Sequence, residues 1–551
     1  MTLDDNFTQR AHDFRMKAAN AKQRLLDALD KPSDAQKAVL QDLNEWVASA
    51  SWWQENCADL ATLDTLRNTV SIRDYEGFRP ALEREVITKG GVLSSSVVAR
   101  WLKTSGTTGS PKLIPYTQHW MRKYRTPGQY VMWDTYLSVC PQLLLHEHAT
   151  LDTQSIREDA APTIQGLPHQ AISNRHPRID SEDWNPPWYD QKWYGPDVPG
   201  THEGRMYIRI RNFLGRDLRA ITAINPSMIM SLYDELRMRK DELLDDLTNG
   251  TLFGEPTDGE YRPNASEGRR LREVLQNPNF TLTDVWPRLA FFSCWNSSSA
   301  AQFLPHVRQV MPDVAYVPFM ACGTEGVVAI PISPERHAAP LAMNQAVYEF
   351  VPASEDPQEW VGAHRSDTLL PHEVTPGQRY HLIMSQGNGL LRLWTGDSYE
   401  IMEIRNGVPW VNFVGRDGIF HSFTGEKLTH TDIEEAFKRV SYHLERKRLP
   451  YLIGPTWNGN PHYVAVVESD ADIDGCEYAT LLDEELMKVN IEYASKRRSG
   501  RLGNLEVGIV PPDTLRRHAE SERASTNQNQ HKFQAHRKND EFFQELREAM
   551  L

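Results

Sequence analysis

Residues 104–112 concentrate the residue types that bind phosphate groups. The segment reads Thr104-Ser105-Gly106-Thr107-Thr108-Gly109-Ser110-Pro111-Lys112. Its hydroxyl side chains can donate hydrogen bonds, its glycines let backbone N–H groups approach a ligand closely, and Lys112 adds a positive charge. Apolar runs at 97–102 and 113–115 flank the segment, so we expect a loop between two buried strands. The segment predicts a phosphate clamp; a flexible Ser/Thr/Gly surface turn is the alternative.

The clamp differs from the P-loop of the common NTPases. A P-loop needs Gly, four residues, Gly, Lys and then Ser or Thr. Here Gly109 is followed by Ser110-Pro111-Lys112-Leu113, with no hydroxyl after the lysine. A different nucleotide chemistry is therefore indicated.

Two later motifs add acidic side chains that suit ATP. Glu325, in Gly323-Thr324-Glu325, offers a hard oxygen ligand for the Mg²⁺ that bridges ATP phosphates, and Thr324 can contact the α-phosphate. Asp397, in Thr395-Gly396-Asp397, can accept hydrogen bonds from both ribose hydroxyls. Taken singly, each acidic residue is more often a surface charge, so the prediction requires a fold that brings the motifs together.

The elements around these motifs indicate an α/β fold. Short apolar runs at 220–224, 289–295 and 314–319 alternate with helical patterns, which predicts a parallel-type sheet whose ligands gather at the strand C-termini. Residues 207–210 are expected to form a strand before the first of them. Further apolar runs, at 347–350, 380–384, 390–394 and 410–414, continue the large domain.

Amphipathic helices are expected at the N-terminus and after the clamp. Apolar residues recur with 4-3-4-3-4 spacing from Phe7 to Leu25, and Ser33 is expected to cap a second helix. The segment 119–140 carries aromatic residues, including Trp133, beside basic ones such as Arg122. These could bind an organic acid; packing of the aromatic face in a core is the alternative.

Length and composition limit the class of protein. A chain of 551 residues is too long for one ordinary core. The net charge of −14 argues against a nucleic-acid partner. No apolar stretch approaches the roughly 18 residues of a membrane span, and the acidic start lacks a secretory layout, so we expect a cytoplasmic protein without membrane attachment.

The ordered motifs resemble those of the adenylate-forming enzymes, and within them the acyl acid amido synthetases, which include the plant auxin- and jasmonate-conjugating enzymes. The resemblance extends from about residue 70 to about residue 540. The supporting segments are the clamp with 113–115, Tyr348-Glu349-Phe350-Val351-Pro352, residues 388–397, 413–416 and 424–428, and Asn529-Gln530-His531-Lys532.

This resemblance implies a fold, an activity and cofactors. The expected fold is a large N-terminal α/β domain of adenylate-forming type, residues 1–415, and a smaller, mobile α+β domain, residues 416–551. The implied reaction uses ATP and Mg²⁺ to join a small carboxylic acid to AMP, releases pyrophosphate, and passes the acyl group to an amine or amino acid. The alternatives are an acyl-CoA ligase, a carrier-protein-loading enzyme and a nucleotide-binding regulator without catalysis.

The resemblance also implies roles for single residues. Lys532 would contact the carboxylate and α-phosphate during adenylation, and Lys427 would approach the nucleotide phosphate. Arg416 would lie in the nucleotide site, with Asp417 at an interdomain hinge. Because Ala321-Cys322 replaces the aromatic residue that usually precedes this acidic motif, the adenine is expected to stack elsewhere, on Tyr348 or Phe319.

The acceptor is expected to be a free amine rather than a thiol. Coenzyme A carries a phosphorylated nucleotide and commonly needs a basic groove, and in the C-terminal domain the compact basic cluster is Lys496-Arg497-Arg498. Such a cluster at a helix end also stabilises the helix dipole. The amine must be deprotonated, and either His531 or a carboxylate could serve as the base.

Overall fold

The computed structural model divides into two compact units. An N-terminal unit comprises 1–104, 111–199 and 204–417, and a C-terminal unit contains 418–551. The structure describes residues 3–88, 90–104, 112–152, 155–156, 163–164, 167–170, 174–175, 184, 186–187, 202–224, 226–257, 259, 261–295, 304–334, 338–416, 419–445, 449–469, 473–515, 517–518, 535–537 and 539–550.

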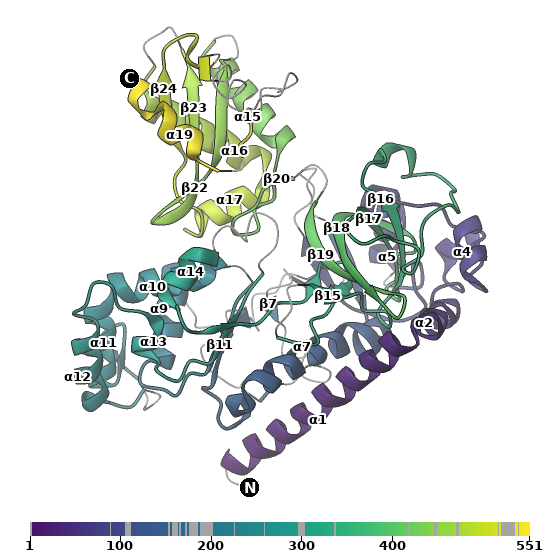
Figure 1. Ribbon diagram of the computed structural model, residues 1–551, viewed down its shortest axis with the longest axis horizontal. Helices are drawn as coiled ribbons and strands as arrows, with labels where there is room; N and C mark the ends of the chain where they lie inside the picture. The colour runs from purple at the N-terminus through teal and green to yellow at the C-terminus, as the bar shows by residue number, and fades with distance from the viewer. Residues whose placement is uncertain are drawn as a thin grey trace. The chain divides into compact units, whose positions relative to one another are not determined.

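Helices form much of the N-terminal unit (Figure 1). They are α1 (Leu3–Asp30), α2 (Pro32–Trp46), α3 (Ser51–Glu55), α4 (Leu63–Thr69), α5 (Tyr75–Thr88), α6 (Gln118–Trp120), η1 (Met121–Arg125), α7 (Thr126–Val139), η2 (Pro141–Leu144), α9 (His202–Phe213), α10 (Pro226–Met238), α11 (Lys240–Asn249), α12 (Ala265–Val274), α13 (Leu282–Val285), α14 (Leu304–Val310) and η5 (Pro357–Glu359). None of the described helices is long and apolar enough to cross a membrane.

The apolar stripe of the first helix packs as its spacing predicts. Phe14, Ala18 and Leu25 are buried, and α1 lies along α7 in Figure 1. The second helix begins at Pro32, with Lys31 as its N-cap and no side-chain cap. The prediction that Ser33 is the cap is wrong, because proline's fixed φ already suits the first helical position.

A four-stranded parallel sheet confirms the α/β prediction for residues 150–316. Its order is β12 (Ala315–Tyr316), β11 (Phe291–Ser293), β8 (Ala220–Thr222) and β3 (Thr150–Asp152). The predicted strand at 207–210 is wrong, since these residues lie inside α9. Tyr207, Ile210 and Phe213 are each fully buried at helical spacing, so tertiary packing decided the conformation of this short apolar run.

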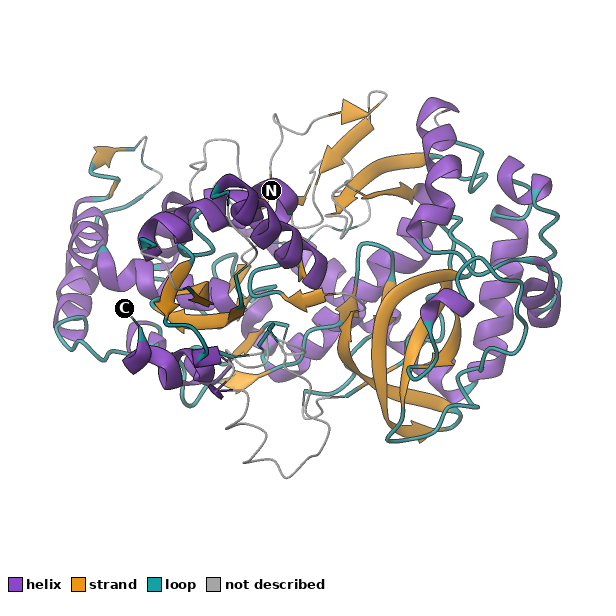
Figure 2. Cartoon of the chain, turned by 90° about the horizontal axis from the view of Figure 1, so that it is seen from above, coloured by secondary structure: helices purple, strands orange, loops and turns teal. Residues whose placement is uncertain are grey.

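Residues 339–416 form an antiparallel sheet rather than a continuation of the parallel one. Its order is β15 (Ala339–Pro340), β19 (Val408–Arg416), β18 (Leu393–Arg405), β17 (Arg379–Ser385) and β16 (Val347–Pro352). Asn406 and Gly407, both at positive φ, join β18 to β19, and such a two-residue turn permits only antiparallel pairing. The strands curve strongly, as the right half of Figure 2 shows.

Short strands complete the N-terminal unit. One sheet has the order β2 (Lys112–Thr117), β1 (Val98–Thr104), β6 (Leu167–Gln170) and β5 (Thr163–Ile164). The remaining pairs are β4 (Ser155–Ile156) with β7 (Asn174–Arg175), β9 (Thr251–Leu252) with β10 (Glu255–Pro256), and β13 (Ala321–Cys322) with β14 (Val327–Ala329).

The C-terminal unit contains both helices and strands. Its elements are β20 (Ile419–His421), β21 (Leu428–Thr429), α15 (His430–His443), β22 (Tyr451–Asn458), β23 (Asn460–Glu468), α16 (Gly475–Val489), α17 (Ile491–Arg498), β24 (Glu506–Val510), α19 (Glu541–Leu546) and η6 (Arg547–Ala549). β22 and β23 form a hairpin, and β24 lies parallel to β23 after α16.

Candidate active site

The two strands that hold the clamp form a hairpin. β1 and β2 are antiparallel, with Thr104 opposite Lys112, so the clamp is their connection. This confirms the two predicted strands on either side of the clamp. The residues Ser105, Gly106, Thr107, Thr108 and Gly109, and the side chain of Thr104, lie outside the described residues, so their phosphate contacts stay a prediction.

Tyr75 fixes the end of the clamp that carries the lysine. The Leu113 backbone N–H donates to the Tyr75 hydroxyl at 2.7 Å, and that hydroxyl donates to the Leu113 carbonyl at 3.3 Å. The Nζ atom of Lys112 lies 5.2 Å from the centroid of the Tyr75 ring. Burial raises the pKa of Tyr75, so the hydroxyl stays neutral and available as donor and acceptor. A helix residue therefore holds the first residues of β2.

The acidic motif lies in the tight connection between β13 and β14. The Gly323 N–H donates to the Gly326 carbonyl at 2.9 Å, closing the turn. Three side chains then bind three successive carbonyls: Arg125 Nη1 donates to Gly323 at 2.9 Å, the Tyr116 hydroxyl donates to Thr324 at 3.0 Å, and Gln386 Nε2 donates to Glu325. We call residues 323–326 the acidic turn.

These bonds satisfy three backbone carbonyls of the acidic turn from within the protein. Carbonyl oxygens repel phosphate, and all three are held by donors from the protein. Gly326 is closely surrounded, because a Cβ there would lie 2.2 Å from Gln386 Oε1 and 2.7 Å from the Met384 side chain. A Cβ on Gly323 would lie 2.5 Å from Glu325 Oε2, so the glutamate side chain would have to move. The Thr324 residue is buried and Glu325 is partly exposed.

Gln386 belongs to a second constrained turn, residues 385–392. Ser385 Oγ accepts from the Arg392 N–H at 2.8 Å, and Trp53 Nε1 donates to the Gly389 carbonyl at 3.0 Å. Gly389 has φ +93°, and a Cβ there would lie 2.1 Å from the Leu93 carbonyl oxygen. Only glycine fits this approach of two backbone segments.

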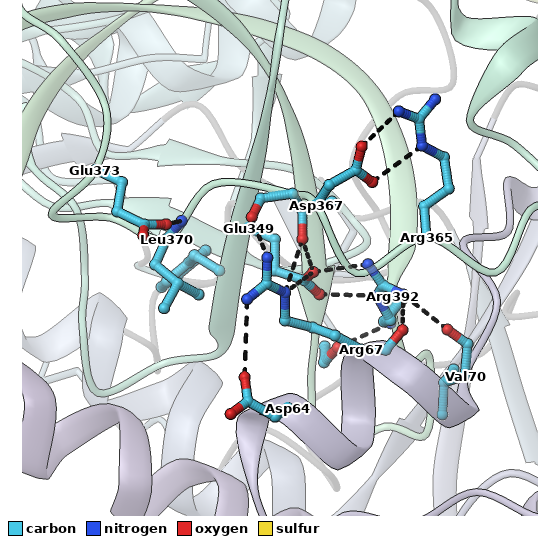
Figure 3. A network of polar contacts seen from close by, with 12 residues as sticks. Asp64, Arg67, Val70, Glu349, Arg365, Asp367, Leu370, Glu373 and Arg392 are labelled. Atoms are coloured by element: carbon cyan, nitrogen blue, oxygen red, sulfur yellow. Dashed lines mark hydrogen bonds and ion pairs between the residues drawn. The ribbon is translucent and has the colours of Figure 1, made fainter.

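A buried ion pair anchors the same turn, and Figure 3 shows its surroundings. Arg392 donates from Nε to Glu349 Oε1 at 3.0 Å and from Nη2 to Glu349 Oε2 at 2.8 Å. Its Nη1 donates to the carbonyls of Arg67 and Val70, both at 2.8 Å. Both charged side chains are almost fully buried. The bidentate geometry ties α4 and β16 to the 385–392 turn.

Asp397 lies on β18, beside the end of β19. Its N–H donates to Thr395 Oγ1 at 3.1 Å, and that hydroxyl donates to the Leu382 carbonyl at 3.0 Å. Asp397 is partly buried and pairs in register with Arg416. The sheet therefore brings together the two motifs that end in these residues.

Three domain descriptions of one family match the chain. The GH3 family N-terminal domain matches residues 21–316, the central domain matches 339–416, and the C-terminal domain matches 430–541. The chain belongs to the GH3 family. This confirms the expected resemblance to acyl acid amido synthetases.

GH3 relatives from Arabidopsis thaliana match nearly end to end at low identity. The 4-substituted benzoates-glutamate ligase GH3.12 is 22% identical over 539 residues, covering 89% of this chain and 90% of the relative. The indole-3-acetic acid-amido synthetase GH3.5 is 20% identical over 544 residues, covering 90% and 87%. The solved structure of the AtGH3.15 acyl acid amido synthetase in complex with 2,4-DB has a TM-score of 0.64 at 17% identity, covering 98% of this chain and 97% of that one. The likeness shows a shared GH3 fold, with a large N-terminal and a smaller C-terminal domain.

Tyr348 does not offer its ring to adenine in this GH3 protein. Its side chain is fully buried, and the hydroxyl donates to the Val327 carbonyl at 2.7 Å and to the Ala342 carbonyl at 3.2 Å. The prediction of adenine stacking on Tyr348 is wrong, because both ring faces lie in the hydrophobic core. Phe319 is half-buried and stays the candidate.

The two substrate candidates, Trp133 and Arg122, have different surroundings. Trp133 is 2% exposed and packs edge-on against Phe14 and Tyr136, so the structure supports the core alternative and contradicts substrate contact by its ring. Arg122 is exposed and lines a surface groove of about 550 Å³ together with Trp46. Its contact with an acid stays a prediction.

The remaining candidates lie in or near the C-terminal unit. Lys427 is partly buried in the turn between β20 and β21. Lys532, His531 and Asp417, and the side chain of Arg416, lie outside the described residues. Their roles therefore stay predictions.

Sequence reasoning missed the residues that hold the acidic turn. The sequence analysis assigns no role to Tyr116 or Gln386, and Arg125 lies in the segment 119–140, where basic residues stand beside aromatic ones. The signal available in the sequence was an arginine within an aromatic segment, because a guanidinium that becomes buried there needs hydrogen-bond acceptors. Arg125 is 5% exposed and finds one of them in the Gly323 carbonyl.

Proposed function

We propose that this GH3 protein is an ATP-dependent acyl acid amido synthetase. It adenylates a carboxylic acid, releases pyrophosphate, and transfers the acyl group to the amine of an amino acid. The observation that carries the proposal is the acidic turn, whose three carbonyls accept hydrogen bonds from Tyr116, Arg125 and Gln386 and whose Thr324 and Glu325 supply the hydroxyl and the carboxylate of the motif. The names of the GH3 relatives support the same reaction class.

Each group has a chemical task in this proposal. A carboxylate is a poor electrophile, and the acyl-phosphate anhydride supplies a good leaving group. The clamp binds the β- and γ-phosphates, Thr324 the α-phosphate, and Asp397 the ribose hydroxyls. Lys532 and Lys427 stabilise the charge that moves onto the phosphate oxygens during adenylation.

Glu325 fits a magnesium ligand of the kind that nucleotide sites use. No group of three acidic, histidine or cysteine side chains forms a metal cage among the described residues. Mg²⁺ commonly binds through one or two carboxylates together with substrate phosphates, and one partly exposed glutamate meets that need. The bound ion would neutralise the phosphate charge.

An amine acceptor is favoured over coenzyme A by the surroundings of the basic cluster. Lys496 Nζ bonds Glu492 Oε2 at 2.6 Å, and Arg497 Nη2 bonds Asp483 Oδ2 at 2.6 Å. Two of the three basic residues are thus engaged in ion pairs within their own unit. The cluster supports the structural alternative at the end of α17. The cytoplasmic location stays a prediction.

Acid-dependent exchange of pyrophosphate into ATP tests the first half-reaction across a panel of acids. Exchange is expected with at least one acid, and its absence under conditions where ATP binds would favour a regulator. Glu325→Gln should raise the Mg²⁺ concentration needed for half-maximal exchange, and Lys532→Ala should slow exchange most.

Product analysis tests the second half-reaction. A competent acid, ATP and Mg²⁺ are incubated with pooled amino acids in one tube and with coenzyme A in another. An amide is expected in the first tube. A thioester in the second, with no amide in the first, would assign the protein to the acyl-CoA ligases. Asp417→Pro should impair one half-reaction more than the other if Asp417 lies at a hinge.

A further inference from the structure

A buried glutamate organises the turn that carries Lys427. β20 and β21 pair with His421 opposite Leu428, and residues 422–427 connect them. Glu426 is fully buried. Its Oε1 accepts from the Phe423 N–H and the Tyr463 hydroxyl, both at 2.6 Å, and its Oε2 accepts from the N–H and hydroxyl of Thr424 at 2.8 and 3.1 Å. Four neutral donors therefore satisfy one buried carboxylate.

The turn holds Lys427 in an unusual backbone conformation. Lys427 has φ +48°, in the left-handed region that non-glycine residues rarely adopt, and Gly425 has φ +97°. The Lys427 N–H donates to Ser422 Oγ at 3.3 Å, and its carbonyl accepts from Asn490 Nδ2 at 3.4 Å. The hydrogen bonds of Glu426 and these flanking bonds join the segment in which Lys427 has this φ to its surroundings.

The choice of lysine at this position indicates a use for its side chain. Glycine or asparagine adopts a left-handed φ at lower cost, so the turn alone gives no reason for a lysine. The strained backbone sets the direction in which the Lys427 side chain leaves the turn.

We propose that Glu426 is a positioning residue that acts through Lys427. Its carboxylate closes the 422–427 turn, the turn imposes the left-handed φ, and that φ directs the lysine toward the phosphate during adenylation. The inference rests on the proposed function, because it assigns a phosphate contact to Lys427. No contact between Glu426 and substrate is involved.

A double-mutant cycle tests this coupling by pyrophosphate exchange and by titration with AMP. Glu426→Gln keeps the side-chain shape, but its NH₂ group faces donors and cannot accept from them. We expect it to lower the exchange kcat about tenfold, whereas Lys427→Gly lowers kcat about a hundredfold, the range for removing one charge-stabilising donor. In the Lys427→Gly background, Glu426→Gln should change kcat and AMP affinity less than about twofold. Lys427→Arg should retain more activity than Lys427→Gly.

Glu485→Gln is the matched control. Glu485 is also a buried glutamate of the C-terminal unit, but it bonds two exposed side chains, His443 on α15 and Lys488 on α16. It should lower the unfolding midpoint without changing kcat in either background. If Glu426→Gln reduced kcat and AMP affinity equally with and without Lys427, the positioning role would be refuted.

A stability comparison separates this inference from the activity. Lys427→Gly should unfold at a higher midpoint than Lys427→Ala, because glycine relieves the positive φ and alanine does not. A lower midpoint for the glycine variant would refute the strained turn even in a fully active enzyme. Failure of every acid in the exchange assay would instead refute the proposed reaction, and the midpoints and AMP titrations would still test the turn.

Discussion

Tyr116→Phe removes one hydroxyl from the acidic turn and leaves the ring in place. The ring is 1% exposed and packs edge-on against Trp120, with centroids 4.8 Å apart, so phenylalanine keeps this contact. The Thr324 carbonyl loses its 3.0 Å bond from the hydroxyl. A buried polar group left unsatisfied costs about 1–3 kcal/mol, and we expect the free energy of unfolding to fall by that amount.

The lost hydrogen bond should also affect catalysis, because it changes what holds the backbone of Thr324. If Thr324 rotates to find another donor, the α-phosphate contact moves with it. About 1.4 kcal/mol corresponds to a tenfold change, so we expect kcat/KM for ATP to fall roughly tenfold. Pyrophosphate exchange at varied ATP and at saturating acid measures this value, and KM for the acid should change little.

Tyr233→Phe is the matched control for this prediction. Its hydroxyl also donates to a backbone carbonyl, that of Phe280, at 2.9 Å, but on α10 and away from the acidic turn. It should change the unfolding midpoint and leave the ATP kinetics unaltered. Unchanged ATP kinetics in Tyr116→Phe, with the expected loss of stability, would refute the idea that the hydroxyl positions Thr324.

Three further predictions follow from the anchoring contacts and from burial. Arg392→Met should cost about 3–5 kcal/mol in urea unfolding, because it removes the bidentate partner of the buried Glu349 carboxylate and leaves it the longer 3.8 Å contact with Arg67 Nε. The double variant with Glu349→Met should recover most of this loss, and no recovery would contradict the pairing. Burial lowers the pKa of His421 to about 3, so on acidification the unfolded state takes up a proton before the folded state does. The free energy of unfolding should therefore fall as the pH drops from 6.5 toward 3, by up to about 1.4 kcal/mol per pH unit. His421→Gln should reduce this pH dependence in urea unfolding, and an unchanged dependence would refute the assignment. Asp397→Ala should raise KM for ATP about tenfold but leave KM for 2′,3′-dideoxy-ATP nearly unchanged, whereas equal effects on both nucleotides would exclude a ribose contact.

The sequence predicted the features that depend on neighbouring residues. The density of hydroxyls, glycines and a lysine in 104–112 indicated a phosphate loop, and β1 and β2 flank it as expected. The 4-3-4-3-4 spacing from Phe7 to Leu25 predicted the buried stripe of α1, and the order of the short motifs indicated the family. Helical spacing and the composition of a motif can be recognised in the sequence because each depends on only a few neighbouring residues.

Only the tertiary structure decided which residues hold the acidic turn. Tyr116 and Arg125 lie 208 and 198 residues before the carbonyls that they bind, and Gln386 lies 61 residues after its own. It also decided that Tyr348 is a core residue and that 207–210 is helical. The local sequence does not determine whether an apolar run or a tyrosine is buried, or what it binds. Burial and hydrogen-bond partners depend on the packing of distant segments, because only packing brings backbone carbonyls and side-chain donors from these segments together.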